Sequence, residues 1–63
     1  MNGTIEVRTT DGTRELVLID KIISVEEVHE TNRGCRIWLI EDNNVDCIDS
    51  YNRVIADIRT ATQ

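Results

Sequence analysis

Between residues 35 and 48, two apolar runs flank a cluster of turn-forming residues, and this pattern predicts a β-hairpin. Both runs are rich in β-branched or aromatic residues, which favour strands. The cluster at residues 42–44 is Asp-Asn-Asn, whose side chains tolerate positive φ and hydrogen-bond their own backbone. Other registers stay open from the sequence alone. A two-residue loop at the first two positions of the cluster would pair Ile40 with Val45 and Trp38 with Cys47.

Both faces of this predicted hairpin carry apolar side chains. Cys35, Ile37 and Leu39 share one face, and Trp38 and Ile40 share the other. A strand with one face in water would alternate apolar with polar residues. We therefore expect other parts of the protein to cover the hairpin on both sides.

The N-terminal part of the chain predicts another hairpin. Apolar and polar residues alternate over residues 3–10, with Ile5 and Val7 on the same face. Asp11-Gly12 is a strong two-residue hairpin signal, because a type I′ turn needs positive φ at both central positions. Closing the hairpin there pairs Val7 with Leu16 and Ile5 with Leu18.

The segment between the two hairpins predicts a third strand. Residues 20–21 are polar and interrupt the apolar pattern, which resumes over residues 22–30. The alternation breaks at residues 26–28, which indicates a bulge or the end of the strand. A polar loop at residues 31–34 then leads into the second hairpin.

After residue 48 the apolar period changes to that of an α-helix. Asp49 or Ser50 can supply the side-chain oxygen that caps the first N–H groups of the helix. Fraying is expected after Thr60, where apolar anchors are lacking. The apolar stripe at helical spacing consists of Tyr51, Val54, Ile55, Ile58 and Ala61.

These elements predict an α+β fold: a small, bent antiparallel β-meander of about five strands with one C-terminal α-helix. We expect a single domain, residues 1–63. A chain this short buries only about 60% of the surface that its unfolded form exposes, so its core is marginal. Small proteins compensate with disulfides, metals or partner subunits. Two cysteines make no disulfide framework, so we expect oligomerisation.

Charge narrows the choice of partner. Twelve acidic and seven basic residues give a formal charge of −5. Proteins that bind nucleic acid carry clustered Lys and Arg, whereas one Lys and six Arg are scattered along this chain. Nucleic acid is therefore not an expected partner. No apolar run is long enough for a membrane span, and no signal-like segment follows Met1, so we expect a cytoplasmic protein.

No set of residues predicts catalysis, and we expect no enzymatic activity, no metal and no cofactor. His29, Cys35 and Cys47 have a spacing that matches no zinc motif. In the hairpin register above, the position opposite Cys47 lies three residues from Cys35, about 10 Å along the strand. That exceeds the ~7 Å limit for a disulfide, so two free, buried thiols are expected.

Apolar residues that a single helix cannot cover predict a protein interface. Val17 and Ile19 lie on the second face of the first hairpin, and Trp38 and Ile40 on the second face of the other. Aromatic residues are common in interfaces. The prediction is a small non-catalytic binding or adaptor protein that acts as a homodimer or larger homo-oligomer. Another protein is its expected partner.

An alternative hypothesis is a small-ligand or nucleotide-binding protein with a pocket at the subunit interface. Its candidate ligand residues are Arg36, Trp38 and Arg53, because Arg pairs with phosphate and Trp stacks on a base. Calorimetric titration with nucleotides separates the two hypotheses. The adaptor hypothesis predicts no heat with any nucleotide.

The order of turns and core positions resembles the small flagellar and swarming motility protein family (FlbD/SwrD-like). That pattern has an Asn-Gly hairpin, an Ile-containing segment ending in acidic residues, a Gly-led hairpin and a Ser-started helix. The resemblance implies the same fold and a role in motility. The residues that carry it are Asp11-Gly12, Ile19, Ile23-Ser24-Val25-Glu26-Glu27, Ile37, Leu39, Val45, Ser50, Val54, Ile55 and Ile58.

In element order the chain is also similar to the carbon storage regulator family of small RNA-binding dimers. Both have five strands and then a helix, and the family's Val-Arg-Ile in the fourth strand corresponds to Cys35-Arg36-Ile37. That family contacts RNA through basic residues near the first strand and before the helix. Here Arg8 is the only basic residue at those positions, so RNA binding by that surface is not expected.

Overall fold

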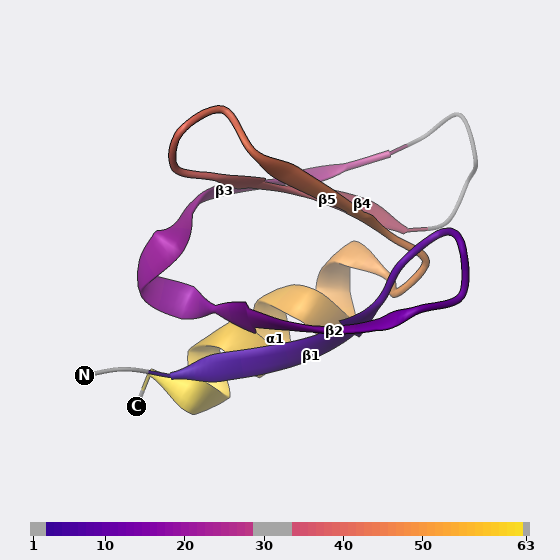
Figure 1. Cartoon of the computed structure of the whole chain (residues 1–63). Helices are drawn as coiled ribbons and strands as arrows, with labels where there is room; N and C mark the ends of the chain where they lie inside the picture. The colour runs from indigo at the N-terminus through magenta and orange to yellow at the C-terminus, as the bar shows by residue number, and fades with distance from the viewer. Residues whose placement is uncertain (1–2, 29–33, 63) are drawn as a thin grey trace.

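The computed structural model describes residues 3–28 and 34–62. Over these residues it has two antiparallel sheets and a C-terminal helix, which confirms the expected α+β fold (Figure 1). The predicted loop at residues 31–34 and the last two residues of the predicted third strand lie largely outside the described residues. In chain order the elements are β1 (Thr4–Arg8), β2 (Arg14–Leu18), the 3-10 turn η1 (Ile19–Lys21), β3 (Ile22–Glu27), β4 (Cys35–Leu39), β5 (Asn44–Cys47) and α1 (Tyr51–Ala61).

β1 and β2 form the first hairpin, but one residue away from the predicted register. Ile5 lies opposite Val17. The predicted pairs of Ile5 with Leu18 and of Val7 with Leu16 are therefore wrong. Since side chains alternate between the faces of a strand, this shift turns Val17 inward and leaves the two leucines on the outer face.

The turn of the first hairpin accounts for the shift. The N–H of Thr9 donates to the carbonyl of Thr13 over 2.8 Å, so the loop has three residues, 10–12, and not two. Gly12 ends the loop with φ of 91°, the left-handed position that such loops require. The carboxylate of Asp11 accepts hydrogen bonds from the Thr9 hydroxyl and, at 3.2 Å, from the Thr13 N–H. These bonds lower the pKa of Asp11.

β3, β4 and β5 form the second sheet in that order. The predicted hairpin of β4 and β5 is present, but its register differs by three residues. Val45 lies opposite Ile37 and not opposite Ile40. Cys47 lies opposite Cys35, where the prediction placed the tryptophan. This register puts apolar residues opposite apolar residues on the inner face of the sheet.

The turn between β4 and β5 begins one residue earlier than predicted. Glu41 and Asp42 have φ of 63° and 62°, and the N–H of Asn43 donates to the carbonyl of Ile40 over 3.4 Å. Two successive left-handed residues are the mark of a type I′ turn. Glycine, asparagine and aspartate are the usual occupants of such positions, so Asp42 suits this turn and Glu41 is the unusual residue.

The two sheets meet where the end of β1 runs beside the end of β5. Thr9 and Cys47 form an isolated antiparallel bridge, and the N–H of Ile48 donates to the carbonyl of Arg8 over 2.9 Å. β1 thus contacts both sheets, and the five strands bend around one shared interior (Figure 1).

Helix α1 lies along the first hairpin and contacts β1 and β3 (Figure 1). The predicted stripe faces the interior: Val54 is fully buried, and Tyr51 and Ile58 pack against the core. At the other end of the helix, Ala61 lies so close to Gly3 that a Cβ added to this glycine would stand 3.3 Å from the alanine Cβ. The core consists of Ile5, Val7, Val17, Cys35, Ile37, Val45, Cys47 and Val54.

Candidate functional site

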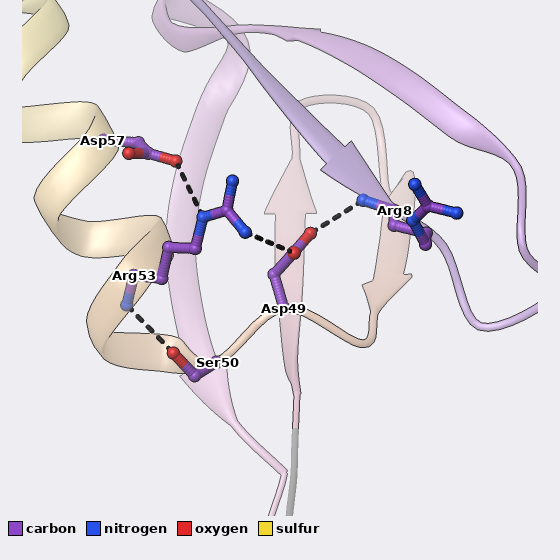
Figure 2. Close-up of polar contacts among 5 residues, drawn as sticks. All are labelled: Arg8, Asp49, Ser50, Arg53 and Asp57. Atoms are coloured by element: carbon purple, nitrogen blue, oxygen red, sulfur yellow. Dashed lines mark hydrogen bonds and ion pairs between the residues drawn. The ribbon is translucent and has the colours of Figure 1, made fainter.

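Asp49, in the link between β5 and α1, ties the first hairpin to the helix (Figure 2). One carboxylate oxygen accepts a hydrogen bond from the backbone N–H of Arg8 at 2.7 Å. The other oxygen lies 3.4 Å from Nη1 of Arg53. Only 15% of the Asp49 side chain is exposed, so water screens these contacts less than it screens a surface ion pair. The carboxylate fixes the end of β1 relative to the first turn of the helix.

The start of α1 is organised by Ser50 and Arg53. The hydroxyl oxygen of Ser50 accepts a hydrogen bond from the backbone N–H of Arg53 at 3.1 Å, so Ser50 is the N-cap of the two predicted candidates. The Arg53 side chain lies between Asp49 and Asp57, whose Oδ2 is 3.8 Å from Nε (Figure 2). An exposed pair of this kind contributes only about 0.3–0.5 kcal/mol, so its main effect is to position the guanidinium.

A hollow of about 240 Å³ opens between the first hairpin and the start of α1. Three arginines and two carboxylates line it, which leaves one net positive charge in a chain of net charge −5. The guanidinium of Arg8 extends away from Asp49 and has no partner among the described residues (Figure 2). The residues that line the hollow are Glu6, Val7, Arg8, Arg14, Asp49 and Arg53.

The outer face of the second sheet carries a row of charges across its three strands. Glu26, Arg36 and Asp46 are cross-strand neighbours there. Nε of Arg36 lies 2.6 Å from Oδ1 of Asp46, and its guanidinium lies 5.7 Å from the centre of the Trp38 ring. The indole N–H of Trp38 donates to Glu26 at 3.0 Å. Arg36 is thus held by a carboxylate and an aromatic ring, which leaves less of its charge for a phosphate ligand.

The three ligand residues predicted from the sequence lie in two places. Arg36 and Trp38 are neighbours on the outer face of the second sheet. Arg53 stands at the start of α1 and lines the hollow together with Arg8 and Arg14. The latter two arginines were not predicted, because a fold is needed to bring a strand and a helix from opposite ends of the chain together.

The four predicted interface residues divide between core and surface. Val17 is 4% exposed and belongs to the core, contrary to its prediction as surface, because the first hairpin is shifted by one residue. Ile19 is half-buried and packs against the core. Trp38 is half-buried and Ile40 is exposed. Three of the four predicted interface residues therefore keep part of their surface in water, and Val17 does not.

Two leucines that the predicted register placed opposite Val7 and Ile5 are exposed. Leu16 is 67% exposed and Leu18 is 47% exposed, both on the outer face of β2. Beside them, Arg14 Nη1 lies 3.5 Å from Glu6 Oε2 on the neighbouring strand. The sequence also fits a three-residue loop that ends at Gly12. Comparing that loop with the two-residue loop would have shown that Leu16 and Leu18 can lie on the outer face.

Cys35 and Cys47 face each other across β4 and β5, and both are free thiols in the core. Free thiols agree with the prediction, but its reason was wrong, since it placed the two residues about 10 Å apart along the strands. A hydrogen bond from the Cys47 thiol lowers the pKa of Cys35. The same contact, together with burial, raises the pKa of Cys47.

The described residues contain no group of three or more His, Cys, Asp or Glu residues that could hold a metal ion, and His29 lies outside them. None of the helices in this part of the chain is long and apolar enough to cross a membrane. No family model, curated protein or solved structure matches the chain. Evidence about function therefore comes from the surfaces described above.

Proposed function

We propose that this protein is a non-catalytic interaction module that pairs with a second copy through the outer face of β1 and β2. The observation that carries the proposal is the exposure of two neighbouring leucines, 67% for Leu16 and 47% for Leu18. Both project from the same face of β2, opposite Glu6 and Thr4 of β1. We call these four residues the leucine face. Large apolar side chains exposed side by side are candidates for a contact surface.

Charges beside the leucines favour a second copy as the occupant. Arg14 and Glu6 form an ion pair next to Leu16. In a two-fold dimer the same patch meets itself, so Arg14 of one copy can pair with Glu6 of the other. Leucines at the centre with charged residues at the rim match the general anatomy of protein interfaces.

The energies involved predict a weak dimer. Full burial of a leucine contributes about 1.5–3 kcal/mol, and Leu18 already realises about half of that in one chain. The leucines of two copies together offset roughly the lower limit of the association cost, about 4 kcal/mol. In the described part of the chain, β2 has a hydrogen-bonded neighbour on one side only, so its edge can add backbone hydrogen bonds. We therefore expect weak self-association, and chain concentrations from about 10 µM to 1 mM are the range in which a weak dimer becomes populated.

Sedimentation equilibrium across that concentration range tests the proposal. The average mass of the wild-type protein should rise with concentration from 7.2 kDa towards twice that value. Leu16→Asp should stay at the mass of one chain, because the aspartates of two copies would repel each other across the two-fold axis. Its melting temperature should not change, because position 16 is exposed in the single chain. Ile23→Asp is the matched control: Ile23 is 65% exposed but lies on β3, so this variant should dimerise like the wild type.

Two outcomes contradict the proposal. A wild-type protein that keeps the mass of one chain at all concentrations has no self-interface. A dimer that is split by Trp38→Glu but not by Leu16→Asp is held by the outer face of the second sheet, where the sequence placed Trp38 and Ile40.

Small-anion binding is a second candidate function, favoured by the hollow beside Asp49. Arg8, Arg14 and Arg53 line it, and guanidinium groups pair well with phosphate and carboxylate. Its volume of about 240 Å³ is below the ~300–1,000 Å³ of pockets that hold drug-sized ligands, so inorganic phosphate fits better than a nucleotide. Calorimetry with inorganic phosphate should give heat that Arg8→Ala abolishes. Absence of heat with phosphate excludes this function.

A further inference from the structure

Cys35 and Cys47 occupy directly opposite positions in an antiparallel strand pair. Opposite residues in such a pair have Cα atoms about 4.5–5.5 Å apart, with both side chains on the same face. A disulfide spans Cα separations of about 4.4–6.8 Å. The fold therefore holds the two sulfur atoms in a position where a bond between them needs little movement of the backbone.

The surroundings of the pair restrict which oxidants can reach it. Cys35 is 1% exposed and Cys47 is 3% exposed. Thr9 of the first hairpin pairs with Cys47 on its other side. Gly34 packs so closely that a Cβ on it would lie 2.1 Å from the Cys47 carbonyl oxygen. A tripeptide disulfide such as oxidised glutathione cannot approach these sulfur atoms in the folded chain, and a small oxidant reaches them when the structure opens locally.

We infer that Cys35 and Cys47 form a peroxide-sensitive dithiol, which hydrogen peroxide converts to a disulfide between β4 and β5. In the first step the sulfur of Cys35 attacks one peroxide oxygen, the O–O bond breaks, and the leaving hydroxide takes up the proton that Cys35 loses and departs as water, giving a sulfenic acid. In the second step the sulfur of Cys47 attacks the sulfenic sulfur, the S–O bond breaks, and water leaves with the thiol proton. Two thiols lose two hydrogens, and one peroxide is reduced to two waters.

The two thiols have different roles because their surroundings differ. The thiolate is the form that attacks peroxide. The hydrogen bond donated by Cys47 stabilises the thiolate of Cys35 and lowers its pKa. Cys47 keeps its proton longer and lies in place to attack the sulfenic acid as soon as it forms.

The disulfide would join the two strands at the end far from their turn and close the loop between them. A bond that closes such a loop restricts the unfolded chain. The oxidised protein should therefore melt at least about 5 °C above the reduced protein, and a reductant should reverse the shift.

Intact-mass analysis after peroxide treatment of the native full chain tests the inference. The protein is quenched, denatured and alkylated with N-ethylmaleimide before it is weighed. The wild type should become two hydrogens lighter and take up no alkylating group. Cys47→Ser should stop at the sulfenic acid of Cys35, which dimedone traps as an adduct. Oxidised glutathione should react with the native wild type far more slowly than with the protein in urea.

A matched control moves one thiol by two positions. Val45→Cys combined with Cys47→Ser keeps two thiols on the same inner face, but displaces them along the strands by about 6.6 Å. This double variant should form no internal disulfide under the same treatment. The inference fails if the wild type retains two alkylatable thiols, if it accumulates sulfinic or sulfonic acid without the internal bond, or if the double variant closes its disulfide equally fast.

Discussion

The two hairpins of this protein differ in what decides their register. In the β4–β5 hairpin, apolar residues lie opposite apolar residues on the inner face, and Arg36 lies opposite Asp46 on the outer face. In the β1–β2 hairpin, the leucines at positions 16 and 18 lie outside while Val17 lies inside. Side-chain sorting therefore agrees with the register of the second hairpin. In the first hairpin, the three-residue loop sets the register at the expense of two leucines.

The first hairpin allows this because both faces of β2 are apolar. Leu16 and Leu18 are on one face, and Val17 is on the other, followed by Ile19 at the start of η1. Either pair can fill the core beside β1, so burial alone discriminates weakly between the two registers. A register that burial specifies weakly is left to the turn. The consequence is an apolar face in water, the leucine face, on the outer side of the first hairpin.

The comparison of the two hairpins is tested first by the stability of two β2 variants, at Val17 and at its neighbour Leu16, where the largest effect is expected. Val17→Asp places a charge in the core and should cost at least about 3 kcal/mol. The whole chain should be stable by only about 3–9 kcal/mol, so this variant should be largely unfolded or close to it. Leu16→Asp lies on the outer face and should change stability by no more than about 0.5 kcal/mol.

Urea unfolding followed by circular dichroism measures both variants of β2. The reverse order of stability, with Leu16→Asp the more damaging variant, would restore the register predicted from the Asp-Gly signal. An equal loss of stability in the two variants would mean that both faces of β2 are covered. A dimer formed at the concentration used would cover the outer face in this way. The measurement therefore belongs at the lowest concentration that gives a signal.

A smaller effect is expected from the two left-handed glycines, one beside each hairpin. Gly12 and Gly34 both have φ of 91°. A Cβ at Gly12 meets nothing within 4 Å, whereas a Cβ at Gly34 would lie 2.1 Å from the backbone oxygen of Cys47. Gly12→Ala should cost about 1 kcal/mol from the backbone conformation alone. Gly34→Ala should cost more than about 2 kcal/mol, because the backbone must also move.

Thermal melting compares the two glycine variants directly. A difference of about 1 kcal/mol corresponds to roughly 4–8 °C in a domain of this size, which is well resolved. Equal melting temperatures would show that the chain before β4 moves away from Cys47 at no cost. That result would also weaken the view of the cysteine pair as closely enclosed.

The parts of the fold that the sequence predicts correctly are those that depend on local pattern. The helix follows from the spacing of Tyr51, Val54 and Ile58, and its start follows from Ser50. The strands follow from alternation. Register does not follow, because it depends on loop length, and the Asp-Gly signal fits both a two-residue and a three-residue loop.

The candidate surfaces depend on contacts that no local pattern reveals. Asp49 accepts a hydrogen bond from the backbone of Arg8, which lies 41 residues earlier in the chain. The hollow beside this contact forms only when β1 and α1 come together. The wrong register of the first hairpin hid the leucine face. The wrong register of the second hairpin hid the facing positions of the two cysteines.

A still smaller effect is expected at the turn of the second hairpin. Glu41 and Asp42 hold left-handed backbone conformations that favour glycine and asparagine. Replacing the pair with Asn-Gly should relieve strain and stabilise the protein by about 0.5–1 kcal/mol, as a rise of a few degrees in melting temperature. The same replacement at Asp11-Gly12 should give no gain, since Gly12 already occupies the left-handed position of the first turn. A loss of stability in the second hairpin would contradict a type I′ turn there.

The smallest effect is expected from the pH dependence of Asp11 in the first turn. Its carboxylate accepts hydrogen bonds from the Thr9 hydroxyl and the Thr13 N–H, and these bonds hold its pKa below the ordinary value of 3.8. A carboxyl whose pKa is lowered by folding contributes stability above its unfolded-state pKa and loses it as the pH falls through the folded-state pKa. Asp11→Asn keeps an oxygen acceptor but cannot titrate. The wild type should therefore have the higher urea midpoint at about pH 6, and it should lose this advantage as the pH falls below 3.8 and through the folded-state pKa of Asp11. The other carboxylates titrate in both proteins, so the difference between the two curves isolates Asp11. An advantage that persists in acid would show that the shape of the Asp11 turn, and not its charge, stabilises the first hairpin.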